Sequence, residues 1–134
     1  ARALGQLKDA RASAPLIVAL GAPEAEVRRW AASALGRVGG NRAVEELIRA
    51  LSTDQDATVR GWAALALART GDSRASAPLI KAVGDDDASV RGQAALALGQ
   101  LGAPQARAAL EAAAKDSDAK VKSRAQAALG RLRN

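Results

Sequence analysis

The sequence predicts an all-α fold in which helix pairs stack into a solenoid. The main observation is a short pattern that recurs five times at a spacing of 31 or 32 residues, at Leu4-Gly5, Leu35-Gly36, Leu67-Ala68, Leu98-Gly99 and Leu129-Gly130. Two further sets keep the same step, one at Val27-Arg28, Val59-Arg60, Val90-Arg91 and Val121-Lys122, the other at Leu16, Leu47, Leu79 and Leu110. Self-similarity of this length is typical of stacked repeats, in which each unit buries its apolar side only against its neighbours.

The first helix of each repeat is predicted from an apolar stripe. In residues 74–83 the apolar residues fall at i, i+4, i+5 and i+8, which is the spacing of a half-buried helix. Pro78 lies early in this helix, where a missing amide is tolerated. The same pattern predicts first helices at about 11–20, 42–51 and 105–114.

The second helix of each repeat is predicted from its two ends. Asp87 precedes Ala-Ser-Val-Arg, where its carboxylate can accept hydrogen bonds from free amides of the first turn. Gly102 follows Leu101 and suits the left-handed residue that ends a helix. The other second helices are expected at about 25–38, 57–70 and 119–132, after the caps Glu24, Asp56 and Asp118, of which Glu24 is a poor cap.

These elements form one expected domain over residues 1–134, with a partial repeat at 1–7 and repeats at about 8–39, 40–71, 72–102 and 103–134. Residues 1–7 resemble the end of an earlier second helix, and the chain starts at Ala1 without Met or a helix cap. We therefore expect a fragment of a longer chain. In the last repeat Glu111 replaces an Ile and Gln126 replaces an Ala, which predicts a terminal repeat with one face toward water.

Composition excludes several classes of protein. The sequence has 49% apolar residues but only 1% aromatics, and it contains no Cys, His or Tyr. Disulfides, the usual zinc and transition-metal ligand sets, and the common groups for nucleophilic or acid–base catalysis are therefore missing. No apolar stretch approaches the roughly 20 residues of a membrane span, and no signal sequence is visible. We expect a cytoplasmic, non-enzymatic protein that needs no cofactor.

Two stretches of the sequence resemble a known family. Asp72-Ser-Arg-Ala-Ser-Ala-Pro-Leu-Ile-Lys-Ala-Val83 and Ala88-Ser-Val-Arg-Gly-Gln-Ala-Ala-Leu-Ala-Leu-Gly-Gln-Leu-Gly102 are similar to HEAT-like repeats of the phycobilisome-lyase type. The resemblance implies a right-handed α-α superhelix of about four helix pairs plus a truncated N-terminal helix, with the second helices on the concave side. Members of this family include bilin lyase subunits, interaction scaffolds and designed binders, so the resemblance leaves the function open.

Charge is distributed unevenly between the two helices of each repeat. Residues 27–38, 59–70, 90–101 and 121–132 contain no Asp or Glu but include Arg28, Arg29, Arg37, Arg60, Arg69, Arg91, Lys122, Arg124 and Arg131. All fourteen acidic residues are expected in first helices, loops or caps. Arg28, Arg60, Arg91 and Lys122 each follow an acidic cap by four residues, which favours local ion pairs. The family resemblance adds the expectation of a hydrogen-bonded ladder along the stack.

A basic, Trp-containing binding surface for a partner is predicted on the concave side of the stack. It is formed by the positions two, three, six and ten after each repeated Val, which point away from the buried side of the second helices. Both Trp residues, Trp30 and Trp62, occupy the same one of these positions in adjacent repeats. Exposed Trp and Arg are frequent binding anchors. Alternatively, each Trp lies flat over a neighbouring helix and fills space, and Gly61 and Gly92 admit the next helix rather than a ligand. The candidate binding residues are Arg29, Trp30, Arg37, Trp62, Leu65, Arg69, Gln93, Leu96 and Arg124.

The function predicted from this surface is a protein–protein interaction scaffold that binds an acidic peptide or an acidic protein surface. One alternative is nucleic-acid binding, since phosphate contacts need mainly Lys and Arg. A second is a bilin lyase-type subunit, in which Arg29, Arg37 or Arg69 would pair with tetrapyrrole propionates. Deoxyhypusine hydroxylase, another HEAT-like enzyme, needs His-Glu metal motifs and is excluded because the chain has no His.

Overall fold

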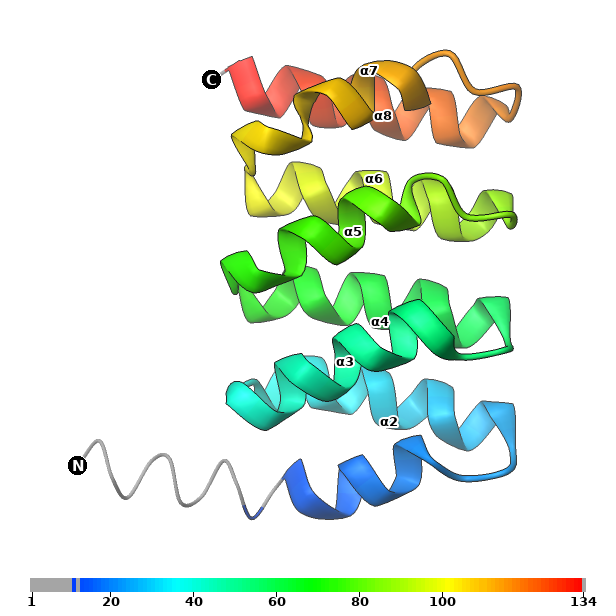
Figure 1. Ribbon diagram of the computed structural model, residues 1–134, viewed down its shortest axis with the longest axis vertical. Coiled ribbons are helices and arrows are strands. Elements are labelled where there is room, and N and C mark those ends of the chain that lie inside the picture. The colour runs from blue at the N-terminus through cyan, green and yellow to red at the C-terminus, as the bar shows by residue number, and fades with distance from the viewer. Residues whose placement is uncertain (1–10, 12, 134) are drawn as a thin grey trace, which may run out of the picture.

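The computed structural model describes residue 11 and residues 13–133, and these form helix pairs that stack in two layers (Figure 1). The first-helix layer contains the helical segment 13–20, α3 (Asn41–Thr53), α5 (Ser76–Ala82) and α7 (Arg107–Ala113). The second-helix layer contains α2 (Ala25–Val38), α4 (Ala57–Thr70), α6 (Ala88–Leu101) and α8 (Ala119–Arg133). The predicted all-α paired architecture is confirmed, while the prediction for residues 1–7 lies outside the described residues.

The predicted bounds agree closely for the second helices and less closely for the first. In the last two repeats a short 3₁₀ turn precedes the first helix, as η1 (Ser73–Ala75) before α5 and η2 (Pro104–Ala106) before α7. By contrast, α3 runs as one continuous helix of 13 residues.

The ends of the second helices follow the predicted caps. The carboxylate of Asp56 accepts hydrogen bonds from the amides of Thr58 and Val59 at 2.8 and 3.2 Å. Asp118 caps α8 in the same way, and Asp87 caps α6 by accepting the amide of Val90. Glu24 makes no side-chain cap, as expected from its longer side chain. Gly71 and Gly102 end α4 and α6 with φ of 67° and 66°, a left-handed conformation that glycine adopts without steric cost.

The core lies between the two layers and is built from aliphatic residues. Leu47 and Leu79 of the first helices and Leu67 and Leu98 of the second are all 0% exposed. Second helices also contact one another directly, since a Cβ on Gly36 would lie only 2.7 Å from the Cβ of Ala66. Small residues therefore allow close packing within the second-helix layer. Closer spacing in one layer is what the inner, shorter side of a curved stack requires.

The two ends of the described stack differ in polarity. Glu111 and Gln126 of the last repeat are exposed, and a Cβ on Gly130 would meet open space, so this end carries the predicted water-facing surface. At the other end Val27 is 38% exposed, whereas Val59, the matching residue of the next repeat, is fully buried. No described second helix lies on that side of α2.

Candidate functional site

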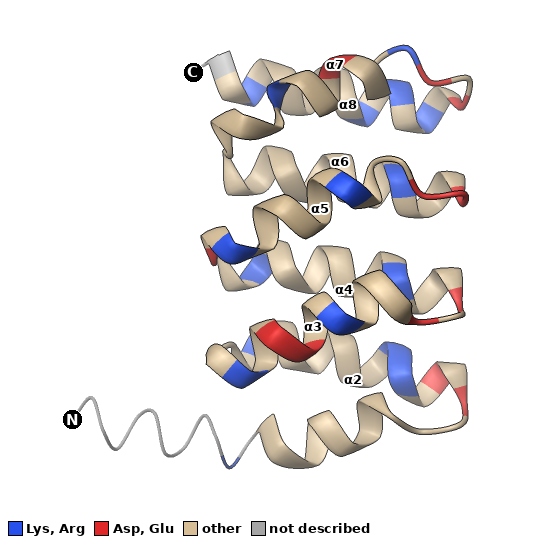
Figure 2. Cartoon of the chain, in the orientation of Figure 1, with Lys and Arg blue, Asp and Glu red and all other residues tan. Residues whose placement is uncertain are grey.

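A ladder of ion pairs runs along the edge where loops join first helices to second helices. Arg28 donates from Nε and Nη2 to the carboxylate of Asp54 at 3.0 and 3.2 Å. Arg60 contacts Asp85 at 3.0 and 3.1 Å, and Arg91 contacts Asp116 at 2.8 and 3.2 Å, with the same pair of nitrogens. Figure 2 shows the acidic residues gathered along this edge with basic residues beside them. We call these three pairs the arginine ladder.

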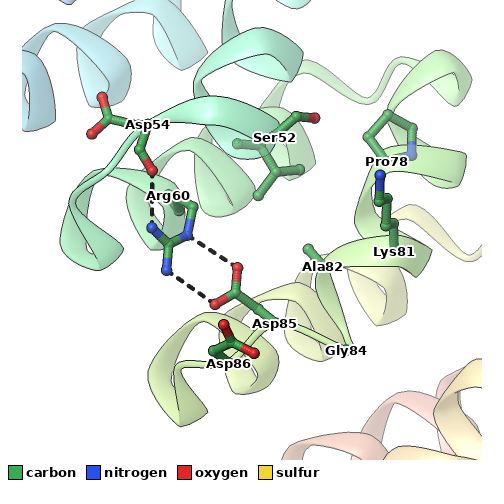
Figure 3. Close-up of a pocket in the computed structure, with 10 residues that line it drawn as sticks. Ser52, Asp54, Arg60, Pro78, Lys81, Ala82, Gly84, Asp85 and Asp86 are labelled. Carbon is green, nitrogen blue, oxygen red and sulfur yellow. Dashed lines mark hydrogen bonds and ion pairs between the residues drawn. The ribbon is translucent and has the colours of Figure 1, made fainter.

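Each ladder arginine also holds the loop of its own repeat. Nη1 of Arg60 donates to the backbone carbonyls of Asp54 and Gln55 at 2.9 and 3.2 Å, as Figure 3 shows for Asp54. Arg28 and Arg91 make the equivalent pairs of carbonyl contacts. One guanidinium therefore ties two successive loops together, and planar bidentate geometry suits arginine better than lysine.

The ladder is confirmed, but the predicted local pairing with the caps is wrong. The partners are not Glu24, Asp56 and Asp87 but the aspartates of the next repeat's loop. The carboxylates of Asp56 and Asp87 accept backbone amides instead, and Glu24 makes no side-chain cap. A recurring Asp-x-Asp spacing, at 54/56, 85/87 and 116/118, is the sequence signal for these partners. In the first repeat Ala22 occupies the corresponding position, and at the last repeat Lys122 replaces the arginine.

Hydrogen bonding stabilises the charged forms in the ladder. Burial of Asp85 acts to raise its pKa, but the hydrogen bond from Arg60, the amide of Asp87 and nearby positive charge outweigh burial and lower the pKa. Hydrogen bonds from Arg91 and from the amide of Asp118 lower the pKa of Asp116. The pKa of Arg60 is raised, chiefly by its hydrogen bond to Asp85. The pairs Arg60–Asp85 and Arg91–Asp116 are therefore ionised near neutral pH.

A cleft of about 410 Å³ opens beside Arg60, between the ends of α3 and α5 (Figure 3). Its lining includes Asp54, Asp85 and Lys81. Asp54 and Asp85 are held by ladder arginines, so little net charge remains there for a ligand. This cleft belongs to the structural edge of the stack.

The predicted binding residues all lie on second helices, on the side opposite the buried Leu35, Leu67 and Leu98. We call this side of α2, α4, α6 and α8 the second-helix face. None of the nine is buried: Arg29, Trp30, Arg37 and Arg69 are exposed, and Trp62, Leu65, Gln93, Leu96 and Arg124 are half-buried. Trp30 is 61% exposed. Their role in binding stays a prediction.

Gly61 and Gly92 admit side chains of the following repeat, as the alternative for these glycines anticipated. A Cβ on Gly61 would overlap the side-chain amide of Gln93, and one on Gly92 would lie 3.3 Å from Nη1 of Arg124. The residue three after the repeated Val, in α6 and in α8, therefore lies over the preceding helix. Trp30 and Trp62 hold this position in α2 and α4.

One acidic residue also lies on the second-helix face. Glu26 belongs to the first turn of α2 and is exposed, so the expectation that every acid lies in first helices, loops or caps is wrong. Helical spacing places Glu26 on the same side of α2 as Arg29 and Trp30. The N-terminal end of the face is thus mixed in charge.

Sequence comparison identifies the repeats. Residues 1–68 and 45–130 match the family of HEAT repeats. The chain belongs to the HEAT repeat family. This confirms the family expected from the repeated motifs. No curated protein is similar enough in sequence to count as a match.

Several solved structures share this fold. The complex of CpcE and CpcF of phycocyanin lyase from Nostoc sp. aligns with a TM-score of 0.76 and 28% identity, covering 87% of this chain and 52% of that chain. Human deoxyhypusine hydroxylase in complex with glycerol aligns with a TM-score of 0.78 and 27% identity, covering 90% and 43%. A designed armadillo repeat protein, at 24% identity and a TM-score of 0.63 over 90% and 64%, shares the fold. The chain spans about half the length of the first two.

Two kinds of feature are absent from the described residues, namely metal-binding groups and membrane-spanning helices. No group of three or more His, Cys, Asp or Glu is placed to hold a metal ion within the described residues. No helix in the part of the chain that the structure describes is long and apolar enough to cross a membrane.

Proposed function

We propose that this HEAT repeat chain is a non-enzymatic interaction scaffold that binds an acidic peptide or acidic protein segment on its second-helix face. The observation that carries the proposal is the state of Arg29, Arg37 and Arg69. All three are exposed, and none forms a side-chain hydrogen bond or ion pair with another described residue. Trp30 and Trp62 lie on the same face and offer apolar surface beside this charge.

The arginine ladder favours a protein partner over nucleic acid. Arg28, Arg60 and Arg91 each hold an aspartate, so they cannot also bind phosphate without breaking the stack. The remaining basic side chains of the face are separated by Leu65, Leu96 and Gln93, and Glu26 adds negative charge at one end. Nucleic-acid affinity depends mainly on the number of neutralised phosphates, which this arrangement keeps small.

Residue types support a role without catalysis. The chain lacks His, Cys and Tyr, and the carboxylates of Asp54, Asp85 and Asp116 are held by arginines. Similarity to phycocyanin lyase makes bilin binding the natural competing proposal. Mixing the chain with a free bilin tests it, and a change in the bilin absorption spectrum that requires Arg29, Arg37 or Arg69 would favour that competitor.

The proposal is tested with a fluorescein-labelled probe peptide of about twelve residues that contains several glutamates and one Phe. We expect anisotropy to rise on addition of the chain. Trp62→Ala should weaken binding about tenfold, the scale of an interface anchor, while the circular dichroism spectrum stays helical. Val18→Ala is the matched control, because Val18 is 77% exposed on the first-helix side.

Two outcomes oppose the proposal. Absence of binding by the wild-type chain removes it. Unfolding of the Trp62→Ala variant shows that this indole belongs to the packing. A DNA oligonucleotide added in parallel should bind more weakly than the peptide; tighter DNA binding with a steep salt dependence would favour the nucleic-acid alternative instead.

A further inference from the structure

A second cleft lies on the second-helix face between the first turns of α6 and α8. Its volume is about 470 Å³, and its lining includes Ser89, Gln93, Asp118, Lys120 and Arg124. Gly92 also lines the cleft. Arg124 extends across this glycine, with Nη1 and Cδ at 3.3 and 3.4 Å from the position a Cβ would take.

Arg124 differs from the other half-buried arginines. Among the described residues four arginines are half-buried, and three of them, Arg28, Arg60 and Arg91, form the ladder. The fourth, Arg124, makes no side-chain hydrogen bond or ion pair with any described residue. Its guanidinium donors are therefore available in the cleft, and its position is already restricted by contact with α6.

At two positions of each second helix, charge changes in a regular way along the stack. The residue before each repeated Val is Glu26, then Thr58, Ser89 and Lys120, and the residue three after it is Trp30, then Trp62, Gln93 and Arg124. Each such pair is four residues apart on one helix and so shares one side of it. At these two positions the face therefore passes from carboxylate and indole at α2 to two basic groups at α8, while Arg29 and Arg37 of α2 lie at other positions of the face.

We propose that the cleft between α6 and α8 takes a single carboxylate side chain of the bound peptide, which pairs with Arg124 and Lys120, while an apolar residue of the same peptide contacts Trp62. This inference rests on the proposed function and adds a direction and a spacing to it. Two helix spacings separate α4 from α8, or about 16–20 Å. An extended peptide rises about 3.3 Å per residue, so the two anchors lie about five or six residues apart.

The acidic residue in the cleft does not prevent this. Oδ1 of Asp118 accepts the amides of Lys120 and Val121 at 2.9 and 3.1 Å, so its charge is directed at the start of α8. Asp116, further along the loop, is held by Arg91. A guanidinium can offer two parallel donors to a carboxylate, and Ser89 and Gln93 add neutral donors to the same space.

The test uses two fluorescein-labelled peptides, one with Phe and a Glu about six residues later in a Gly-Ser background, the other with Gln in place of that Glu. We expect Arg124→Gln to weaken binding of the Glu peptide about tenfold and to leave the Gln peptide unchanged. Arg107→Gln, which removes an exposed charge from α7, is the control and should change neither. Melting curves confirm that each variant folds, and Arg124→Lys provides a second variant that keeps the charge but loses the bidentate geometry.

The outcomes separate this inference from the proposed function. If Trp62→Ala weakens the Glu peptide but Arg124→Gln does not, the carboxylate site is wrong and the scaffold proposal stands. Equal weakening of both peptides by Arg124→Gln also overturns the site, because it shows that the effect does not depend on the carboxylate. Moving the Glu to about two residues from the Phe should abolish the effect of Arg124→Gln, and persistence of the effect contradicts the spacing. Failure of both peptides to bind the wild-type chain overturns both proposals.

Discussion

Arg28 and Arg29 are neighbours in the sequence, yet they belong to two regions with different roles. Arg28 lies on the loop edge, where it holds Asp54 and two backbone carbonyls. Arg29 points to the second-helix face, is exposed and has no ion-pair partner among the described residues. The first region joins successive repeats. In the second region the exposed arginines have no ion-pair partner among the described residues. Positively charged residues therefore indicate a binding surface only when they do not already form ion pairs within the chain.

The same difference explains why the ladder arginines recur at a regular spacing. Its three arginines repeat at the step of the stack, because each needs a loop aspartate from the next repeat. Residues on the second-helix face follow no such rule: the position three after Val holds Trp30, Trp62, Gln93 and Arg124 in turn. A structural contact imposes repetition, whereas this face changes from one repeat to the next. That variation is where a specific partner could be recognised.

The largest expected effect comes from the core that supports both regions. Leu79 is fully buried between the layers, so Leu79→Ala should lower the free energy of unfolding by about 2–5 kcal/mol. Chemical denaturation followed by circular dichroism measures the change. Lys81→Ala, at an exposed position of the same helix, is the control. If the two variants lose equally little free energy of unfolding, Leu79 does not lie on the buried face of the helix.

The next largest effect on stability is expected from the ladder, and it is compared with a substitution on the second-helix face. Asp85→Asn weakens the charged hydrogen bonds that Arg60 donates, and we expect it to cost about 1–3 kcal/mol. Arg69→Gln removes an exposed, unpaired charge and should change stability by less than about 0.5 kcal/mol. Both values come from the same denaturation experiment. Equal costs would contradict the division between the two regions.

The ladder also predicts a dependence on pH. The pKa of Asp85 is lowered in the folded chain, so its stabilisation is present above the unfolded pKa of about 3.9 and is lost as pH falls through the folded value. The difference in melting temperature between the wild-type chain and Asp85→Asn should stay constant from about pH 7 to pH 5 and shrink below about pH 4. A difference that persists unchanged at low pH would show that the charge of Asp85 is not its source.

A smaller effect compares the two indoles of the second-helix face. Trp62→Phe leaves Trp30, which is 61% exposed, and should give red-shifted emission that iodide quenches readily. Trp30→Phe leaves the half-buried Trp62, with bluer emission and weaker quenching. Identical spectra from the two variants would show that the indoles have the same environment.

Much of the fold could be predicted because it depends on local signals. Asp56, Asp87 and Asp118 cap helices through contacts within three residues, and Gly71 and Gly102 end helices by their own backbone freedom. The ladder partners were missed because Arg60 and Asp85 lie 25 residues apart, and spacing within one helix favoured the nearer Asp56. A search for charges in step with the repeat would have found them.

The candidate site could be predicted only as a set of positions. Helical spacing placed Trp62 and Arg124 on the same side of their helices, and the structure agrees that neither is buried. Spacing could not show that Arg124 lies across Gly92 in a cleft, because that contact joins two repeats. It also missed Glu26, because the segments without acidic residues were counted from the repeated Val. In the structure α2 begins at Ala25, before Val27, and so includes Glu26.

One measurement tests the division of the arginines most directly. The triple variant Arg29→Gln, Arg37→Gln and Arg69→Gln is compared with Arg42→Gln, Lys81→Gln and Arg107→Gln, which loses the same charge from the first-helix layer. We predict unchanged unfolding midpoints for both and at least a tenfold weaker affinity for the glutamate probe peptide in the first variant alone. Equal affinities in the two variants would contradict a binding role for the second-helix face.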